Sequence, residues 1–369
     1  MNPLFDLLLN LLRIKKGICI FFTVSLLNSL TITLKLNALN PFNNTITGVD
    51  ANNIPLTIKL DDIVSIKFSI GSCKSCTVAY VANLGDGTVS VIDTISNTVT
   101  ATIPLLGNPF DIALAPDGSR AYVTHPGNST ISIIDTTTNG VIATIPVIIA
   151  PAGIAITPDG SRLYITHITS NIVSVVNTTT NSVIATIPVE DGPVEVAISP
   201  DGLRAYVVNR SSLSVSVIDT ANNTLITSIP VGNFPNGIAI SPDGLRVYVP
   251  NGNDSNFSLI NTVTNTVIAN IPVPIGPLYV AITPDGSRLY ITHFTSNIVS
   301  VIDTTTNNVI TTIPVGNNPK EIAITPDGTR AYVTTSDDTV SVIDTATNMA
   351  IDTIQVGDSP WGIAIGAIC

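Results

Sequence analysis

Three carboxylates occupy one position of a repeated unit and are the residues best placed to do chemistry. They are Asp111, Glu195 and Glu321, and each stands directly before a short apolar run of the Ile-Ala-Ile type. Carboxylate oxygens are the ligands that calcium, magnesium and manganese prefer. If the apolar run is the innermost strand of a radial array, the three acids approach one another at the mouth of a central channel. The sequence leaves two interpretations open, a divalent cation site and a solvated acidic rim.

Apolar and aromatic residues stand at this position or at the one before it in several units. Residues that a scaffold needs recur in every repeat, so the positions that vary are the better candidates for function. Large apolar side chains at such positions suit contact with a partner. Those expected at the rim are Phe110, Leu278, Tyr279 and Trp361. Together with the three acids they form the predicted binding site.

The histidines share a different position of the unit. His125, His167 and His293 each stand three residues after a repeated tyrosine. Equivalent positions on different units point away from one another, whereas metal ligands must converge on one ion. We expect each histidine to replace a turn-capping asparagine. The sequence contains no P-loop, nucleophile elbow or dinucleotide fingerprint, which favours a non-enzymatic role.

Two series of residues that recur at regular intervals define the repeat. A tyrosine recurs every 42 residues, at Tyr80, Tyr122, Tyr164, Tyr206, Tyr248, Tyr290 and Tyr332. Pro-Asp-Gly recurs with the same period, with its acids at Asp117, Asp159, Asp201, Asp243, Asp285 and Asp327. An arginine follows each of these acids by three residues, and we expect it to pair with local carboxylates. Repeats of about this length containing several short strands are typical of β-propellers.

The unit that spans residues 153–195 contains four short apolar runs separated by turn residues. The fourth run carries a proline near its end, which suits an outer edge strand because proline cannot donate to a ladder. The first unit lacks its own inner run of the Ile-Ala-Ile type. The last run of this type in the chain, residues 362–365, is expected to supply it. The sequence therefore predicts an all-β, seven-bladed β-propeller of four-stranded antiparallel blades, closed by the C-terminal strand joining the N-terminal blade.

The tyrosine motifs, such as those at residues 80–83, 122–124 and 332–334, together with the Pro-Asp-Gly series, resemble the YVTN-type β-propeller repeat. The resemblance covers about residues 80–369. It implies a seven-bladed propeller of the kind found in surface-layer and other exported proteins, with partner surfaces on the channel-mouth face. It implies no single activity. More distant relatives of this repeat include lactonases, which hold a catalytic cation at the channel.

An apolar run from Gly17 to Leu34 follows Arg13, Lys15 and Lys16. We interpret residues 1–36 as a signal peptide or membrane anchor. Residues 37–76 form an Asn-rich connector with short strands near 57–60 and 63–68, and residues 77–369 form the propeller. This order predicts an exported, extracellular or cell-surface protein that touches membrane only through its N-terminal segment.

Cysteine spacing suggests a disulfide bond that holds the two ends of the ring together. In register with the repeat, Cys76 and Cys369 both fall at the position of the Pro-Asp-Gly glycine. We expect Cys369 to pair with Cys76 or Cys73. Cys73 and Cys76 also form a CxxC sequence, so a redox pair is the alternative.

The net charge of -11 repels phosphate backbones, so a nucleic-acid partner is not expected. The sequence favours a non-enzymatic exported or cell-surface scaffold that binds a protein or a cell-surface glycan, without a cofactor. The propeller is expected to be monomeric, because its edge prolines oppose lateral assembly. The alternative is a divalent-metal-dependent, lactonase-like hydrolase in which Asp111, Glu195 and Glu321 hold a cation such as calcium.

Overall fold

The computed structural model describes the backbone of residues 20–26, 31–40, 45–49, 55–59 and 63–70, and the backbone and side chains of residues 77–368. The chain divides into two compact units, Thr77–Ile368 and a unit formed by Met1–Cys76 with Cys369. The expected cysteine pairs, formed by Cys73, Cys76 and Cys369, lie outside the described residues.

The N-terminal unit contains a five-stranded antiparallel sheet with the order β4-β3-β2-β1-β5. Its strands are β1 (Ile20–Leu26), β2 (Thr31–Asn40), β3 (Thr45–Val49), β4 (Pro55–Lys59) and β5 (Ile63–Ile70). Residues 1–19, which begin the expected signal or anchor segment, lie outside the described residues. Within the described part of the chain, no helix has the length and apolar character that a membrane span requires.

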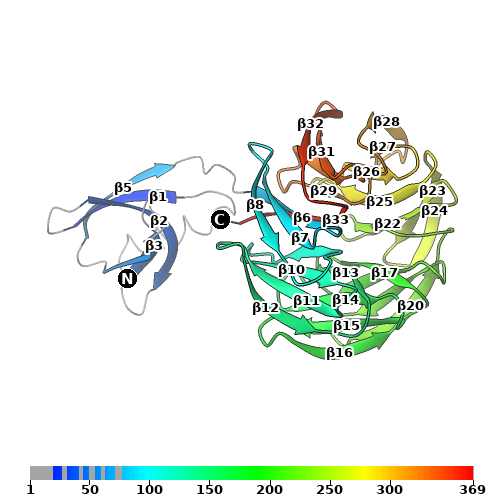
Figure 1. The fold of residues 1–369 in the computed structure, drawn as a ribbon, viewed down its shortest axis with the longest axis horizontal. Helices are drawn as coiled ribbons and strands as arrows, with labels where there is room; N and C mark the ends of the chain where they lie inside the picture. Colours follow the sequence, from blue (N-terminus) through cyan, green and yellow to red (C-terminus); the bar gives the residue numbers. More distant parts are fainter. Residues whose placement is uncertain are drawn as a thin grey trace. The chain divides into compact units, whose positions relative to one another are not determined.

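The second unit is a ring of seven four-stranded antiparallel sheets, termed blades 1 to 7 (Figure 1). From the channel outward, blade 1 contains β33 (Pro360–Ala367), β6 (Thr77–Asn83), β7 (Thr88–Asp93) and β8 (Thr98–Pro104). Blade 2 contains β9 (Ile112–Leu114), β10 (Arg120–His125), β11 (Thr130–Asp135) and β12 (Gly140–Pro146). Blade 3 contains β13 (Pro151–Ile156), β14 (Arg162–His167), β15 (Ile172–Asn177) and β16 (Ser182–Pro188).

The remaining blades repeat this order. Blade 4 contains β17 (Pro193–Ile198), β18 (Arg204–Asn209), β19 (Ser214–Asp219) and β20 (Thr224–Pro230). Blade 5 contains β21 (Ala239–Ile240), β22 (Arg246–Asn251), β23 (Asn256–Asn261) and β24 (Thr266–Pro272). Blade 6 contains β25 (Pro277–Ile282), β26 (Arg288–His293), β27 (Ile298–Asp303) and β28 (Val309–Pro314). Blade 7 contains β29 (Ile322–Ile324), β30 (Arg330–Thr334), β31 (Thr339–Asp344) and β32 (Met349–Gln355).

The two ends of the propeller close the ring within blade 1. Strand β33 pairs antiparallel with β6, so that Ile363 lies opposite Val81 and Ala364 lies opposite Tyr80. Figure 1 shows this C-terminal strand, in red, beside the cyan start of the propeller. The predicted fold class and the predicted ring closure are both confirmed.

Burial follows the position of a strand within its blade. The second and third strands are almost wholly buried, as in β10 and β11, and the seven repeat tyrosines are at most 1% exposed. The fourth strand faces solvent, and its terminal proline is exposed, as Pro104 is in β8. The proline therefore removes no ladder partner, since no strand lies beyond it.

The turns at the far end of the inner strands follow the chemistry of Pro-Asp-Gly. Gly118 adopts a φ of 73°, and Asp117 Oδ1 accepts the backbone N–H of Ser119 at 2.9 Å. Hydrogen bonds from Ser119 lower the pKa of Asp117. These acids are therefore parts of a recurring hairpin, at the end of each inner strand opposite to the variable residues.

The repeat arginines join neighbouring blades. Arg162 Nη1 donates to the carbonyl of Thr220 in blade 4 at 2.6 Å, and the Tyr164 hydroxyl donates to Asn223 Oδ1 at 2.8 Å. The same arginine-to-carbonyl bond recurs from Arg120, Arg204, Arg246, Arg288 and Arg330. The charge of a repeat arginine also lowers the pKa of nearby acids, as that of Arg120 does for Asp117 and Asp135. The expected pairing with local carboxylates is therefore electrostatic, while the hydrogen bonds go to the next blade.

Candidate functional site at the channel mouth

One residue of each blade stands directly before the Ile-Ala-Ile run of the inner strand. In order around the channel these residues, here termed the channel ring, are Asp111, Gly153, Glu195, Gly237, Tyr279, Glu321 and Gly362. Large and small residues alternate, except where Tyr279 precedes Glu321. Each glycine lies against the large residue that follows it, since a Cβ on Gly153 would lie 2.8 Å from Glu195 Cα. Side-chain volume therefore explains part of the variation at this position.

The acids of the channel ring accept backbone N–H groups. Asp111 Oδ1 accepts from Ile112 at 2.7 Å and its Oδ2 accepts from Ile154 of the next blade at 2.8 Å. Glu195 Oε1 accepts from Val196 at 3.1 Å, and Glu321 Oε2 accepts from Ile363 of the next blade at 3.3 Å. Asp111 and Glu321 thus connect adjacent inner strands.

Burial dominates the electrostatics of these acids. It raises the pKa of Asp111 to about 7, against the opposing effect of two backbone hydrogen bonds. Burial likewise raises the pKa of Glu195 and Glu321, and the negative charge of Asp111 raises both further. Asp111 is 3% exposed and Glu195 is 9% exposed, so the solvated acidic rim considered from the sequence is not what the structure contains.

The acids also do not form a ligand set. Within residues 77–368, no group of three or more His, Cys, Asp or Glu side chains is arranged to hold a metal ion. The three carboxylates influence one another's pKa, but each already serves a backbone donor. The divalent-cation interpretation therefore finds no coordinating arrangement among the described residues.

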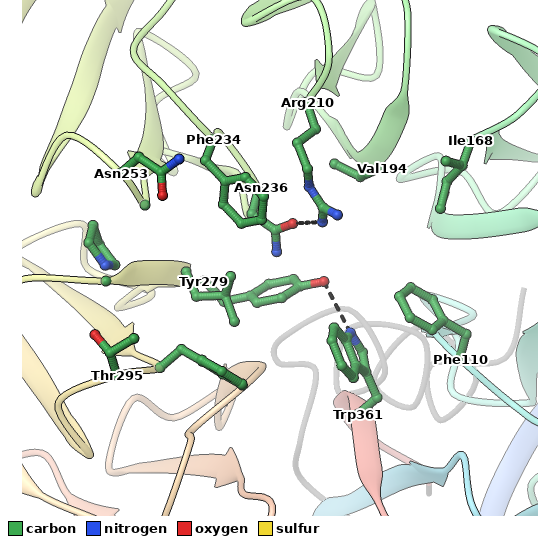
Figure 2. Close-up of a pocket in the computed structure, with 15 residues that line it drawn as sticks. Phe110, Ile168, Val194, Arg210, Phe234, Asn236, Asn253, Tyr279, Thr295 and Trp361 are labelled. Atoms are coloured by element: carbon green, nitrogen blue, oxygen red, sulfur yellow. Dashed lines mark hydrogen bonds between the residues drawn. The ribbon is translucent and has the colours of Figure 1, made fainter.

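A cavity of about 430 Å³ opens on the face where the inner strands begin. Four of the seven predicted site residues line it, and these are Phe110, Leu278, Tyr279 and Trp361 (Figure 2). The three acids are not among its lining residues. The structure therefore separates the predicted site into an apolar pocket and a buried ring of acids.

Aromatic side chains organise the pocket. The rings of Phe110 and Trp361 are stacked with centroids 5.1 Å apart and an interplanar angle of 27°. Trp361 Nε1 donates to the Tyr279 hydroxyl at 3.3 Å, as Figure 2 shows. Lys320 Nζ lies 5.1 Å from the centre of the Trp361 ring and donates to the carbonyl of Pro360 at 2.9 Å. These contacts fix the tryptophan on the wall of the pocket.

Sequence reasoning missed Arg210 and Phe234, which form the opposite wall together with Asn236 (Figure 2). The Arg210 guanidinium lies over the Phe234 ring at 5.0 Å, and its Nη2 donates to Asn236 Oδ1. One signal was available in the sequence. Between residues 77 and 369, Arg210 and Lys320 are the two cationic residues outside the series of repeat arginines.

The histidines are not among the lining residues of this pocket and are buried at the ends of their strands. His125 Nε2 is 2.8 Å from Ser132 Oγ, the equivalent of the bond from Asn209 Nδ2 to Ser216. Burial lowers the pKa of His125, His167 and His293, the last to about 4. In contrast to the His125 bond with Ser132, His167 Nδ1 and His293 Nδ1 lie 3.2 Å and 3.3 Å from the carbonyl oxygens of Ile149 and Ile275. The side-chain bond of the asparagine is thus reproduced by His125 alone of the three, and the turn-capping role stays a prediction.

Replacing Gly153 by alanine should destabilise the propeller by about 1–3 kcal/mol. The new Cβ would lie 2.6 Å from the carbonyl oxygen of Val194, and this backbone atom cannot turn aside. Gly127→Ala is the matched control, because its Cβ would meet nothing within 4 Å. Urea unfolding of both variants measures the difference, and equal stabilities would show that the channel ring is not tightly packed.

Comparison with known proteins places the fold but no activity. No protein-family model matches the chain, and no curated protein matches it in sequence. A functionally unknown protein from Desulfotomaculum acetoxidans DSM 771 is similar in structure, with a TM-score of 0.71 and 19% identity, over 78% of this chain and 98% of that one. Hydrazine synthase of Kuenenia stuttgartiensis has a TM-score of 0.68 and 23% identity, over 74% of this chain and 94% of that one.

A third solved structure, dihydro-heme d1 dehydrogenase NirN, has a TM-score of 0.60 and 15% identity. The match covers 77% of this chain and 64% of NirN, which is less than two thirds of its length. At these identities the likenesses show a β-propeller and nothing about chemistry. The YVTN-type repeat itself remains a resemblance.

Proposed function

We propose that this propeller is a non-enzymatic, exported or cell-surface scaffold that binds a partner protein through its channel-mouth face. The observation that carries the proposal is the aromatic pocket of about 430 Å³ on that face. Pockets lined by aromatic residues and a central arginine are typical anchor points of interfaces. The proposal of export rests on the apolar run of residues 17–34 and its basic flank.

The alternative of a metal-dependent hydrolase is less well supported. It would use Asp111, Glu195 and Glu321 as cation ligands, and these acids lie buried outside the lining of the pocket. Two of them connect adjacent inner strands. Their geometry is explained by the closure of the ring, so no observation on the described residues favours the hydrolase over the scaffold.

Site-directed photo-crosslinking in the cells that produce the protein tests the proposed function. A photoreactive residue at Leu278 reports on the pocket, and one at Leu245 reports on the hairpins at the opposite face. Leu245 is 51% exposed, so it is an accessible control. We expect a protein to crosslink from position 278 and not from 245. Crosslinking to a glycan, or to a protein only from position 245, would contradict the proposal.

A further inference from the structure

Two hydrogen-bond donors in the wall of the pocket lack an acceptor. Arg210 Nε and Asn236 Nδ2 are buried and have no hydrogen-bond partner among the described residues. Asn236 is 1% exposed, and Figure 2 shows its amide nitrogen turned toward the space between Arg210 and Tyr279. Buried donors without a partner are unfavourable and rare in folded proteins. This wall therefore holds two donors for which the described residues supply no acceptor, and a turn of the Arg210 side chain would uncover them.

The charge of the pocket indicates what kind of acceptor fits. Among the residues that line it, Arg210 carries the one full charge, and no carboxylate is present. The acids of the channel ring lie outside this lining, and burial raises the pKa of all three. Glu195 is the acid close enough to act on Arg210, since the charge of each influences the pKa of the other. An arginine beside an amide donor is suited to a planar, anionic oxygen acceptor.

The rest of the pocket suits an apolar body. The residues that line it include Phe110, Phe234, Leu278, Phe294 and Trp361. A volume of about 430 Å³ lies at the lower end of the range for small-molecule sites, so it holds a body of one or two rings. An apolar ligand with a single polar end can therefore place that end at Arg210 and its body against the stacked rings.

We propose that the pocket binds the carboxylate of an apolar or aromatic acid, with Arg210 and Asn236 as the donors and the Phe110–Trp361 stack as the apolar wall. Arg210 Nε and Asn236 Nδ2 are covered in the unliganded pocket, so binding requires a turn of the half-buried Arg210 side chain. Two sources share this chemistry, a free small acid and the C-terminal residue of a polypeptide. The inference rests on the proposed function, because it names what the same face recognises.

The chain offers a direct reporter, since Trp361 is its single tryptophan. The full chain is titrated with 3-phenylpropionate and, as the matched neutral control, with 3-phenylpropionamide, while tryptophan emission is recorded. We expect a saturable change in emission, with the acid binding roughly tenfold to hundredfold more tightly than the amide, as for a hydrogen bond to a charged group. A short peptide ending in phenylalanine, with a free or an amidated C-terminus, forms the second arm.

Variants at Arg210 connect the effect to the proposed donor. Arg210→Met keeps the apolar contact with Phe234 and should remove the preference for acid over amide, while Arg210→Lys should retain part of it. Unchanged thermal midpoints of both variants show that they fold. Binding of the acid and the peptide acid alike indicates a site for free acids, and binding of the peptide acid alone indicates a chain terminus.

Equal binding of acid and amide in every arm that shows binding, or a preference that survives in Arg210→Met, would overturn the inference. The absence of any change in emission with all four probes would also overturn it. Neither result decides the proposed function, because crosslinking from position 278 reports on a partner whatever the chemistry of its anchor. A partner that crosslinks there while no acid binds would leave the scaffold proposal standing and remove only the carboxylate.

Discussion

A chain that ends at residue 357 is expected to lose the cooperative unfolding of the propeller. The truncation deletes β33, which is the inner strand of blade 1, and uncovers β6, a strand with no exposed residue. It removes the ladder from Pro360 to Ala367 and the buried side chain of Ile363. The loss should be comparable to the whole stability of a domain, about 5–15 kcal/mol. Thermal and urea unfolding followed by circular dichroism measure it.

A point substitution separates closure of the ring from shortening of the chain. Ile363→Ala leaves the strand in place and should cost about 2–5 kcal/mol, because the side chain is 3% exposed and lies opposite Val81. Ile351→Ala is the matched control, since this isoleucine of β32 is 48% exposed and should change stability by less than about 0.5 kcal/mol. A truncated chain with an unchanged unfolding midpoint would show that six blades and an open seventh are self-sufficient.

The features that sequence predicted well are those that repetition makes visible. The period of 42 residues was sufficient to predict the number of blades. The propeller segment begins with a tyrosine-motif strand and ends with an Ile-Ala-Ile strand, and these complementary ends predicted which strand closes the ring. The same reasoning was incomplete for the repeat arginines, because the sequence of one repeat does not show which residues of the neighbouring blade it contacts. Their acceptors lie one blade further along, as Thr220 does for Arg162.

The channel ring shows why the site was only partly predictable. Variation at this position suggested function, but an alternation of glycine with larger residues is also how inward side chains fill a narrow ring. The acids are therefore buried among backbone donors, whereas the aromatic residues one position earlier face the pocket. Arg210 and Phe234 were missed because they lie in loops, outside the two variable positions from which the site was predicted: Arg210 directly follows β18, and Phe234 lies between β20 and β21.

Above about pH 6.5 we expect the propeller to lose stability as the pH rises. The pKa of Asp111, Glu195 and Glu321 is higher in the folded chain than in the unfolded chain, chiefly because of burial. The folded state therefore holds protons that the unfolded state has released. A group of this kind stabilises the fold fully at low pH and loses its contribution as the pH rises through its folded pKa, which is about 7 for Asp111.

The buried histidines set the lower limit of this window. Their folded pKa lies below the ordinary value of 6.5, so they destabilise the fold as the pH falls below that value and oppose the acids there. Above pH 6.5 the unfolded-state histidines lose their remaining protons within about one pH unit, which offsets part of the loss from the acids. As the pH rises, each acid that still holds its proton in the folded state lowers the free energy of unfolding by up to about 1.4 kcal/mol per pH unit. We expect a loss of at least about 1–2 kcal/mol between pH 6.5 and 8.5, measured by urea unfolding.

A pair of glutamate variants attributes this dependence to the channel ring. Glu195→Gln removes one buried acid and the negative charge that raises the pKa of Glu321, so the slope of stability against pH should flatten. Glu190→Gln changes an exposed glutamate of the preceding loop and should leave the slope as it is. If the parent protein were equally stable at pH 6.5 and 8.5, the raised pKa values of the three acids in the folded state would be contradicted. A slope that Glu195→Gln leaves intact would assign the dependence to groups outside the channel ring.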